Sequence, residues 1–417
     1  MRTVLLDSWP VAHLAIGDYS KPLCGKEMSS DDLVDHRSHG FVIENGIFVK
    51  IADSDEIESE FGRQESISLN GRAIVPGLID AHTHLLWGGD RSDEMSLRQR
   101  GKSYQDIASL GGGINYTVHE TRNLSLDELI NHGKIRLSHS LRNGTTAIET
   151  KSGYGLDTQS ELRLLHAANE LKSESDMEIS LTWLGAHNAP PNMDIKTYVD
   201  QIISEQLPAV IEQGLAKSAD VFCEDGWFTL EQTEIICKEA KSNGMDIRLH
   251  VDEFSDSNGL SLASELGATT ADHALHSSDD NREAAHASGT MQGFLPGTPY
   301  VHGSTGWPPI QYCIDQGYAW SLATDFNPNC RSLSLPMVGS IVTHRMNIDP
   351  LAALVAVTRN PATTIIRDDG LAHGIIAEGT SANLNILRGT KIEGWCQTPG
   401  DTPFSATMCN GNITNHE

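Results

Sequence analysis

The sequence lacks the long apolar run that a membrane-spanning helix requires. Hydrophobic residues make up 39% of its 417 residues, but no continuous apolar stretch reaches the roughly 18 to 20 residues needed to cross a bilayer. The stretch that follows Met1 resembles an opening strand, without the apolar core and small-residue cleavage site of a secretory signal. We therefore expect a soluble, cytoplasmic protein that has no membrane partner.

Paired cysteines and positive charge are also scarce. The seven cysteines include no C-x-x-C pair, and an odd number cannot complete a disulfide framework, so reduced thiols are expected. The chain carries 30 basic against 56 acidic residues, a formal net charge of -26. Such a surface would repel a phosphate backbone and anionic lipid. Nucleic acid is therefore not an expected partner.

The middle of the chain alternates apolar segments with amphipathic ones. Strands are expected at 74–84, 145–150, 179–187, 220–224, 246–251, 269–273, 291–295 and 319–325. Helices are expected at 158–171, 196–206, 230–242, 257–266, 278–287 and 308–316. Alternation of this kind predicts a parallel sheet with crossover helices, and eight repeats predict an α/β protein of the TIM-like (β/α)8 barrel class.

Both ends of the chain have a pattern of short strands and turns that differs from the strand–helix alternation of the middle. Residues 1–73 contain short strands and turns, among them a hairpin signal in which Asn45-Gly46 separates two apolar segments. Residues 370–417 show the same pattern of short apolar segments separated by turns. We predict one small β-sandwich domain formed by both ends, with the barrel at 74–369.

Two histidines follow the first expected barrel strand. His82 and His84 are two residues apart, so on an extended strand their side chains share one face and converge on one point. Two nitrogen ligands presented in this way, just before the flexible Gly88-Gly89, are typical of a catalytic metal site. The simpler alternative is a pair of polar histidines at a strand end, and it is disfavoured only if further ligands lie elsewhere in the chain.

Polar residues recur at the carboxyl ends of the other expected strands, where the active-site groups of such barrels lie. Those ends carry Lys151, His187, Glu224, His250, His273 and Asp325. Taken singly, His250 or His273 could be a satisfied barrel histidine, and Asp325 could cap a loop. Together with His82 and His84 they suit zinc or ferrous iron and leave room for a water, whose pKa such a metal lowers to near 7.

These residues carry a family resemblance. Pro76-Gly-Leu-Ile-Asp-Ala-His-Thr-His84, with His250, His273 and Asp325, resembles the amidohydrolase superfamily. Within it, the chain resembles the imidazolonepropionase family at 82–91, 111–122, 149–155, 184–187, 220–224 and 324–328. The combination of K-S-G-Y-G with G-G-G-I-x-x-T-V is specific to that family.

The resemblance implies a mononuclear metal site. Its ligands would be His82, His84, His250 and Asp325, holding one zinc or iron ion per chain. Binuclear relatives use a carboxylated lysine at the end of the fourth strand. Here Cys223-Glu224-Asp225 stands at that place and Lys151 belongs to the second strand, so a single ion is expected.

The resemblance also implies the remaining roles. Asp325, Glu253 and His273 would be catalytic: Glu253 would hydrogen-bond a ring nitrogen or relay a proton, and His273 would orient the water or stabilise an oxyanion. Arg91 and Tyr104 would hold a propionate, and Tyr154 and His187 would line the ring. The substrate-binding residues implied are thus Arg91, Tyr104, Tyr154, His187, Glu253, Asn327, Asn329 and Cys330.

The implied activity is hydrolysis of the cyclic amide of the small molecule 4-imidazolone-5-propanoate to N-formimidoyl-L-glutamate, in histidine degradation, by a metal-bound hydroxide. The family is typically homodimeric. After Asp325-Phe-Asn-Pro328 it usually continues with Gly and then Ser or Thr, whereas this chain has Asn329-Cys330. A related cyclic amidohydrolase or deaminase, acting on another imidazolone- or hydantoin-like ring, is therefore the alternative. A non-catalytic scaffold should have lost Asp325, His273 or Glu253, and none is lost.

Overall fold

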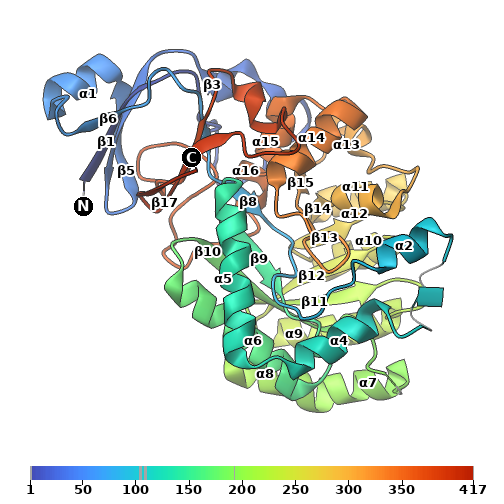
Figure 1. Cartoon of the computed structure of the whole chain (residues 1–417). Coiled ribbons are helices and arrows are strands. Elements are labelled where there is room, and N and C mark those ends of the chain that lie inside the picture. The colour runs from blue at the N-terminus through green and yellow to red at the C-terminus, as the bar shows by residue number, and fades with distance from the viewer. Residues whose placement is uncertain (1, 103–105, 108–109, 192, 417) are drawn as a thin grey trace.

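Eight parallel strands form the centre of the computed structural model, which describes residues 2–102, 106–107, 110–191 and 193–416 (Figure 1). In sheet order they are β8 (Leu78–Asp80), β9 (Thr145–Lys151), β10 (Glu178–Ala186), β11 (Ser218–Cys223), β12 (Asp246–Val251), β13 (Thr270–His273), β14 (Met291–Phe294) and β15 (Trp320–Leu322). Beyond β8 and β15, Thr83 and Phe326 form a parallel bridge. The ring of strands is thereby joined, and the predicted (β/α)8 barrel is confirmed.

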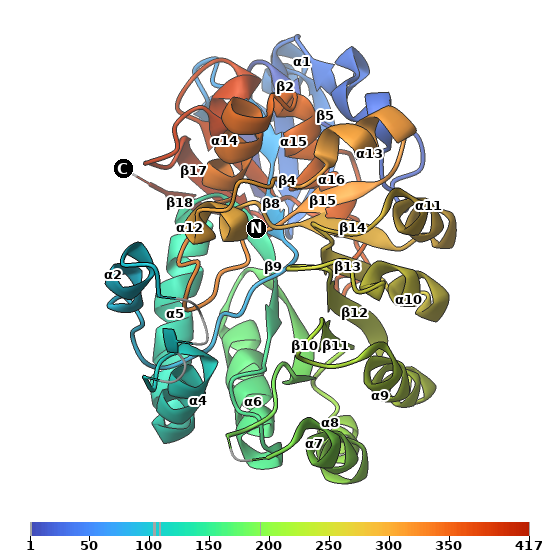
Figure 2. The ribbon, with the colours of Figure 1, turned by 90° about the vertical axis from the view of Figure 1, so that its right-hand side faces the viewer.

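Helices surround this ring, as Figure 2 shows for α6, α9, α10 and α11. Between the strands lie α2 (Glu94–Gln99), α4 (Gly113–Asn123), α5 (Leu126–Arg142), α6 (Thr158–Glu174), α7 (Ile195–Gln201), α8 (Leu207–Gln213), α9 (Leu230–Ser242), α10 (Gly259–Leu266), α11 (Asp279–Ser288), α12 (Gly297–His302) and α13 (Ile310–Gln316). After the last barrel strand come α14 (Leu335–Met346), α15 (Pro350–Ala356) and α16 (Arg359–Ala362). Among the described residues, none of the helices has the length and apolar character needed to span a membrane.

Local capping explains why several helices begin where the sequence predicts. Helix α9 starts after Thr229, whose hydroxyl accepts a hydrogen bond from the Gln232 backbone N–H, while the Gln232 side chain returns to the Thr229 N–H. This reciprocal capping box satisfies two N–H groups that have no partner within the helix. The structure gives α9 the predicted bounds, 230–242.

The predicted helix at 196–206 is too short. After α7 the chain continues through a π-helical turn, η3 (Ile202–Gln206), directly into α8. Pro208, which has no N–H, closely follows this turn, at the point where the π-helical register of η3 changes to that of α8. The chain is therefore helical from Ile195 to Gln213, and the proline coincides with the end of the π-helical turn.

The predicted strand at 74–84 is wrong as a single element. It is divided into β7 (Ile74–Pro76), which belongs to a different sheet, and β8 of the barrel. Gly77 lies between them, and a Cβ there would meet Thr146 Oγ1 at 2.2 Å. The chain crosses from one sheet to the other at a point where only glycine fits.

Strands from both chain ends form two further sheets. One has the order β5 (Ile47–Asp53), β4 (His39–Glu44), β1 (Arg2–Ser8), β6 (Ser66–Ser68). The other has the order β18 (Asn412–Asn415), β17 (Phe404–Cys409), β16 (Leu384–Leu387), β7, β2 (Val11–Ala12), β3 (Val34–Asp35). Short helices α1 (Ser54–Phe61), η1 (Gly25–Ser29), η2 (Asp31–Leu33) and η4 (Ile392–Cys396) accompany them. Strands β1, β5, β6 and β17 lie at the upper left of Figure 1.

These two sheets share one apolar core. Leu5, Phe41 and Phe48 come from the first sheet, whereas Leu384 and Met408 come from the second, and all five are fully buried. Asn45 and Gly46 have φ values of +52° and +79° between β4 and β5, as the predicted Asn-Gly hairpin turn requires. The small β-sandwich from both ends is therefore present, and its boundaries at residues 73 and 370 stay a prediction.

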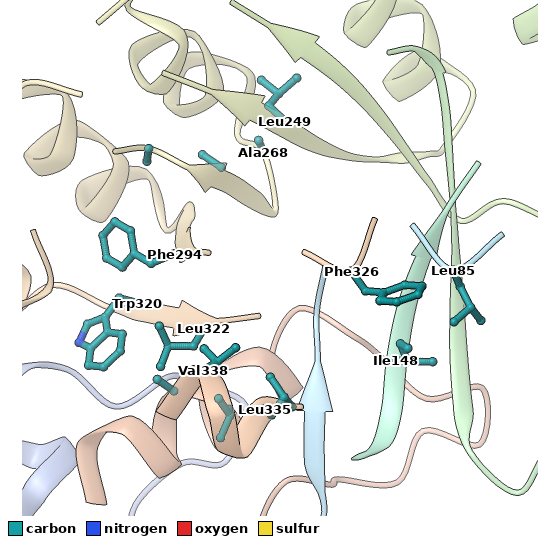
Figure 3. Close-up of a cluster of buried hydrophobic side chains, with 14 of the residues drawn as sticks. Leu85, Ile148, Leu249, Ala268, Phe294, Trp320, Leu322, Phe326, Leu335 and Val338 are labelled. Carbon is teal, nitrogen blue, oxygen red and sulfur yellow. The ribbon is translucent and has the colours of Figure 1, made fainter. Parts of the chain in front are cut away.

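The barrel core reaches up to the loops that follow β8 and β15. Leu85 and Phe326, the residues directly after His84 and Asp325, pack in the same buried cluster as Ile148 of β9 (Figure 3). The Phe326 carbonyl accepts a 2.8 Å hydrogen bond from the His84 N–H. Close packing of this kind holds the two loops, and hence His84 and Asp325, in fixed positions.

Candidate metal centre and active site

The four predicted metal ligands lie together at the carboxyl end of the barrel. Asp325 Oδ1 is 3.7 Å from both His82 Nε2 and His84 Nε2. His250 Nε2 is 3.4 Å from His84 Nε2. All four side chains are buried. His82 and His84 lie beyond the end of β8, on either side of the Thr83 bridge, and not on one long strand as expected.

The donor set fits a transition metal. Within the described part of the chain, two groups have ligand atoms within 4.8 Å of one another: His82, His84 and Asp325, and His82, His250 and His273. His82 Nε2 is buried and has no hydrogen-bond partner among the described residues. A buried polar atom without a partner is costly, and imidazole nitrogens with one carboxylate suit zinc or iron.

The electrostatics of the cluster favour neutral imidazoles. Burial, followed by Lys151 and His250, lowers the pKa of His82 well below its usual value. Burial, followed by His187 and His250, does the same to the pKa of His84. A histidine must be neutral to bind a metal, so both rings are held in the protonation state that a ligand needs.

Two aspartates hold the histidine rings from behind. Asp272 Oδ2 lies 2.8 Å from His82 Nδ1, and Asp220 Oδ1 lies 3.0 Å from His250 Nδ1. A carboxylate on Nδ1 fixes the tautomer and leaves Nε2 available for a metal. Sequence reasoning assigned neither aspartate a role. The available signal was an acidic residue within an apolar barrel strand, β11 or β13.

Lys151 lies within this layer as one member of an ion-pair cluster. Its Nζ is 2.9 Å from Glu149 Oε1 and 2.8 Å from Asp220 Oδ2, and all three side chains are fully buried. Burial alone would lower the pKa of Lys151, but Asp220 and Glu149 outweigh it and raise the pKa. Lys151 therefore balances carboxylates as an ammonium group, which is a different role from a carboxylated bridging ligand.

Glu253 and His273 lie beside the four predicted ligands. His273 Nε2 is 3.5 Å from Glu253 Oε2. Burial, followed by Asp325 and Glu224, raises the pKa of Glu253 well above its usual value. The Glu224 carboxylate accepts the backbone N–H groups of Glu253 at 2.7 Å and Ser255 at 3.1 Å. Glu224, which the sequence placed at a strand end, thus fixes the loop that carries Glu253.

Two residues of the cluster have strained backbones. His273 and Asp325 have φ values of +67° and +50°, in the left-handed region that residues other than glycine rarely occupy. Such a conformation costs on the order of 1–3 kcal/mol and persists only where the surroundings enforce it. Residues of this kind gather at active sites, which is consistent with the position of both at strand ends.

A cavity of about 430 Å³ opens above the cluster, a size that suits a small molecule. Its lining includes eleven of the predicted site residues: three predicted metal ligands, His84, His250 and Asp325, together with Arg91, Tyr154, His187, Glu253, His273, Asn327, Asn329 and Cys330. Tyr104 lies outside the described residues. The cavity is also lined by residues that sequence reasoning missed, among them Phe222, Trp227, Phe254, Thr298 and His302. Phe222 lies within β11, whereas Trp227 and Phe254 lie in the loops after β11 and β12, where no spacing signal marks them.

Tyr154 and His187 form one aromatic wall of the cavity. The His187 ring stacks on His84, with centroids 5.1 Å apart and planes at 19°, and the Tyr154 ring lies 5.2 Å from His187. Burial, followed by His250, lowers the pKa of His187 to about 3. The buried Glu161 carboxylate accepts the backbone N–H groups of Gly153 and Gly155 and so holds the loop that carries Tyr154.

Arg91 is arranged differently from the expected open guanidinium fork. Its Nε and Nη2 donate to the two Glu94 carboxylate oxygens at 2.8 and 2.9 Å. Arg98 Nη1 lies 3.8 Å from the same carboxylate and donates to Asn329 Oδ1 at 3.2 Å. Two guanidinium groups thus share one carboxylate, and the group of Arg91, Arg98 and Glu94 has an excess of one positive charge beside the cavity.

The loop after β15 is organised by Asn327. Its side-chain oxygen accepts the backbone N–H groups of Asn329 at 2.8 Å and Cys330 at 3.1 Å. The buried Cys330 thiol lies 3.6 Å from the Thr324 carbonyl oxygen, to which it donates. Asn329 and Cys330 are therefore accommodated by the loop, and Asn329 connects it to Arg98 of α2.

The family was tested by comparison with known proteins. A model of the amidohydrolase family matches residues 73–415, so the chain belongs to the amidohydrolase family. An imidazolonepropionase from Shewanella sediminis is 41% identical over 319 residues, covering 75% of this chain and 77% of the relative. One from Clostridium tetani is 37% identical over 394 residues, covering 93% of each chain. Within its family, the chain therefore belongs with the imidazolonepropionases.

Solved structures agree on the fold. Guanine deaminase from E. coli has a TM-score of 0.72 at 12% identity, covering 99% of each chain. The 5-methylcytosine deaminase from Klebsiella pneumoniae has a TM-score of 0.72 at 16% identity, covering 100% of this chain and 98% of that one. At such low identity, the likeness supports the architecture of a barrel with a small β domain and carries no information on the substrate.

Proposed function

We propose that the chain hydrolyses the cyclic amide of 4-imidazolone-5-propanoate to N-formimidoyl-L-glutamate, a step of histidine degradation. The observation that carries this proposal is the buried cluster of histidines and Asp325 beneath a cavity of about 430 Å³, in a chain whose relatives include an imidazolonepropionase 41% identical to it. The dimensions and the charge of the cavity support a small anionic substrate.

His82, His84, His250 and Asp325 would hold one zinc or iron ion. Such an ion polarises a carbonyl and lowers the pKa of a bound water to near 7. Asp272 and Asp220 would keep the Nε2 atoms of His82 and His250 directed at the ion. A single ion is supported by the ion pairs of Lys151, whose ammonium group is engaged with Glu149 and Asp220.

His273 would stabilise the negative charge that develops in the reaction, and Glu253 would transfer the proton. Their 3.5 Å separation places an acid and an imidazole side by side at the cavity wall. His273 would donate a hydrogen bond to the oxygen that becomes negative when water adds to the ring carbonyl. Glu253 would take a proton from the water and deliver it to the departing ring nitrogen, a relay supported by a pKa shifted upwards by burial.

The two walls of the cavity would orient the substrate. Tyr154 and His187 would lie along the imidazolone ring. The propionate would be attracted by the excess positive charge of Arg91 and Arg98, and Asn327, Asn329 and Cys330 would border it. Because Glu94 occupies the Nε–Nη2 edge of Arg91, a substrate carboxylate cannot use that edge unless Glu94 moves.

We also propose a cytoplasmic homodimer. All seven cysteines are free thiols, which supports a reducing compartment. The homodimer rests on the family resemblance alone, and light scattering of the purified protein would test it.

The direct test supplies the substrate in situ. Imidazolone propionate is generated from urocanate with purified urocanase, and its loss and the formation of N-formimidoylglutamate are followed by absorbance and mass spectrometry. We expect consumption that depends on this chain. No consumption by metal-loaded protein would refute the proposal.

A second candidate function is that of a related cyclic amidohydrolase or deaminase acting on another ring. The contact of Arg98 with Asn329 favours it, because Asn329 and its neighbour Cys330 both depart from the family pattern. Hydantoin-5-propionate and guanine are suitable probes for hydrolysis and for ammonia release. Faster turnover of either than of imidazolone propionate would favour this second candidate.

The charge of the cavity gives a further test. Arg91→Gln should reduce kcat/KM by roughly tenfold to a hundredfold, because an interaction with a charged group contributes about 1.5–3 kcal/mol. Arg345→Gln, an exposed residue of α14, is the matched control. If both variants retain full kcat/KM, Arg91 does not bind the propionate.

A further inference from the structure

A second, larger cavity of about 810 Å³ lies against the same two loops that carry His84 and Asp325. Trp87 and Gly89 of the first loop, and Phe326 and Arg331 of the second, form one part of its wall. The rest comes from residues 332–334 of the second loop, from α5 and the following Asn143, and from the C-terminal segment at 400–402. The full lining is Trp87, Gly89, His132, Ile135, Arg136, His139, Arg142, Asn143, Phe326, Arg331, Ser332, Leu333, Ser334, Gly400, Asp401 and Thr402.

The charge of this wall is opposite to that of the whole protein. It contains three arginines, Arg136, Arg142 and Arg331, against one acidic residue, Asp401, whereas the chain has 56 acidic and 30 basic residues. Like charges gathered in one cavity repel one another unless an anion lies between them. The wall therefore has the composition of an anion site.

Arg136 has no carboxylate partner among the described residues. In the described part of the chain, no carboxylate oxygen lies within 4.0 Å of its nitrogens, and its two hydrogen bonds go to the backbone carbonyls of Leu85 and Trp87. Its guanidinium carbon lies 3.9 Å from the Trp87 ring centroid. Burial, followed by Arg331, lowers the pKa of Arg136 to about 10. A partly buried cation whose main neighbouring charge is another cation would be stabilised by a bound anion.

Arg142 and Arg331 complete the cationic wall. Arg142 is exposed and has no ion pair among the described residues. Arg331 lies 5.3 Å from the same Trp87 ring and 3.1 Å from one acidic residue, Asp90, which is not part of the lining. Among the lining hydroxyls, Thr402 Oγ1 already donates to the Arg142 carbonyl and Ser332 Oγ to Met337 Sδ, whereas Ser334 Oγ accepts the Met337 N–H and keeps its own proton for another partner. Guanidinium and hydroxyl groups together are donors that match carboxylate and phosphate oxygens.

The cavity is connected directly to the candidate metal centre. Trp87 is three residues after His84, and Phe326 is the residue after Asp325. Their rings are 6.0 Å apart, and the Phe326 carbonyl accepts the His84 N–H at 2.8 Å. A ligand that holds Trp87, Phe326 and Arg331 in place would therefore also hold the two loops that carry His84 and Asp325.

We propose that this cavity, lined by Arg136, Arg142 and Arg331, is a second binding site for a small organic or inorganic anion with carboxylate or phosphate groups, and that its occupation stabilises the metal-ligand loops. The binding site is independent of the proposed reaction. The stabilising effect rests on the proposed metal ligands His84 and Asp325.

Binding is tested on the full chain by calorimetry at constant ionic strength. Glutarate represents a free dicarboxylate, inorganic pyrophosphate represents a phosphate, and uncharged glutaramide is the control. We expect saturable binding of one or both anions and none of glutaramide. The preferred anion identifies the ligand class. Absence of saturable binding of both anions would overturn the proposal.

Variants then locate the bound anion. Arg142→Gln and Arg331→Gln should each raise the Kd about tenfold or more, since loss of one charged contact removes at least about 1.4 kcal/mol of binding free energy. Arg345→Gln on α14 and Arg91→Gln at the first cavity should leave the Kd unchanged. Binding that is weakened by Arg91→Gln but not by Arg142→Gln would place the anion in the first cavity and overturn the proposal. If Arg345→Gln weakens anion binding as much as Arg142→Gln does, the attraction is non-specific and the proposal is overturned.

The link to the metal loops has a separate readout. The rate at which a chelator removes zinc from the loaded protein should fall several-fold when the anion is bound, and Arg142→Gln should abolish this protection. This measurement needs no turnover, so it remains informative if the substrate is different. An unchanged removal rate at saturating anion would refute the link while leaving the binding result to stand on its own.

Discussion

The small β domain and the mouth of the barrel bury different kinds of side chain. The core shared by the two small sheets consists of apolar residues such as Leu5, Phe41 and Phe48. The barrel mouth buries histidines, aspartates and Lys151. Apolar burial stabilises a fold by roughly 25 cal/mol per Å², whereas buried charges seldom improve on apolar residues of the same volume. The buried polar side chains at the barrel mouth therefore indicate a functional site, because they stabilise the fold less than apolar residues would.

The comparison predicts that substitutions in the two regions separate activity from stability. At the mouth, a change should remove turnover or metal binding. In the small domain, a change should lower the free energy of unfolding and leave the kinetics of the folded protein intact.

The largest effect is expected for His250→Ala. Loss of one ligand should empty the site and reduce kcat at least about a thousandfold, about 4 kcal/mol, because the metal contributes several kcal/mol to the transition state. Kinetics and elemental analysis of the variant measure this. His166→Ala, an exposed histidine of α6, is the control. A His250→Ala protein that keeps both metal and turnover would exclude His250 as a ligand.

The next effect is expected for Lys151→Met. This change leaves Glu149 and Asp220 buried without their common cation, which should cost about 3–5 kcal/mol of unfolding free energy. Because Asp220 also holds His250, metal affinity should fall about tenfold to a hundredfold. Urea unfolding and metal titration measure the two effects.

The exposed ion pair of Lys134 with Glu174 supplies the control for that experiment, since both side chains are 51% exposed. Lys134→Met should change the unfolding free energy by less than about 1 kcal/mol. Equal effects of the two lysine substitutions would contradict the role given to the buried cluster.

Phe48→Ala tests the small domain. Phe48 is fully buried and its ring centroid lies 5.9 Å from that of Phe41, so truncation should cost about 3–4 kcal/mol of unfolding free energy. We expect kcat/KM of the folded variant to stay within about twofold of the parent protein. Ile67→Ala in the same domain, where the side chain is 48% exposed, should change neither quantity. A large loss of kcat in the folded Phe48 variant would mean that the two regions are coupled.

The smallest effect is expected when Asn329→Gly and Cys330→Ser are combined. Asn329 accepts a hydrogen bond from Arg98 and Cys330 donates to a backbone carbonyl, so the loop tolerates both residues. We expect a change of less than about tenfold, 1.4 kcal/mol, in kcat/KM on imidazolone propionate. A gain of more than tenfold would instead show that the native chain prefers another ring.

Much of the barrel could be predicted because hydrophobic periodicity is a local signal. The strand at 246–251 and the helix at 230–242 have their predicted bounds. The strand at 74–84 was wrong because its division between two sheets depends on the contact of Gly77 with Thr146, which lies 69 residues away and leaves no local pattern.

The same distinction applies to the site. His82, His84, His250 and Asp325 could be placed because strand ends of a barrel converge. Asp220 and Asp272 were missed because their partners are decided by side-chain packing across strands. The engagement of Arg91 by Glu94 was missed as well, although the two are three residues apart, because the short helix α2 that brings them together has no apolar periodicity.

The central claim is a single metal site at the barrel mouth that supports hydrolysis. The most direct test measures bound zinc and iron per chain, together with turnover of imidazolone propionate, during stepwise metal removal and return. The account predicts about one ion per fully active chain and turnover proportional to that occupancy. Two tightly held ions per active chain, or full turnover by metal-free protein, would contradict it.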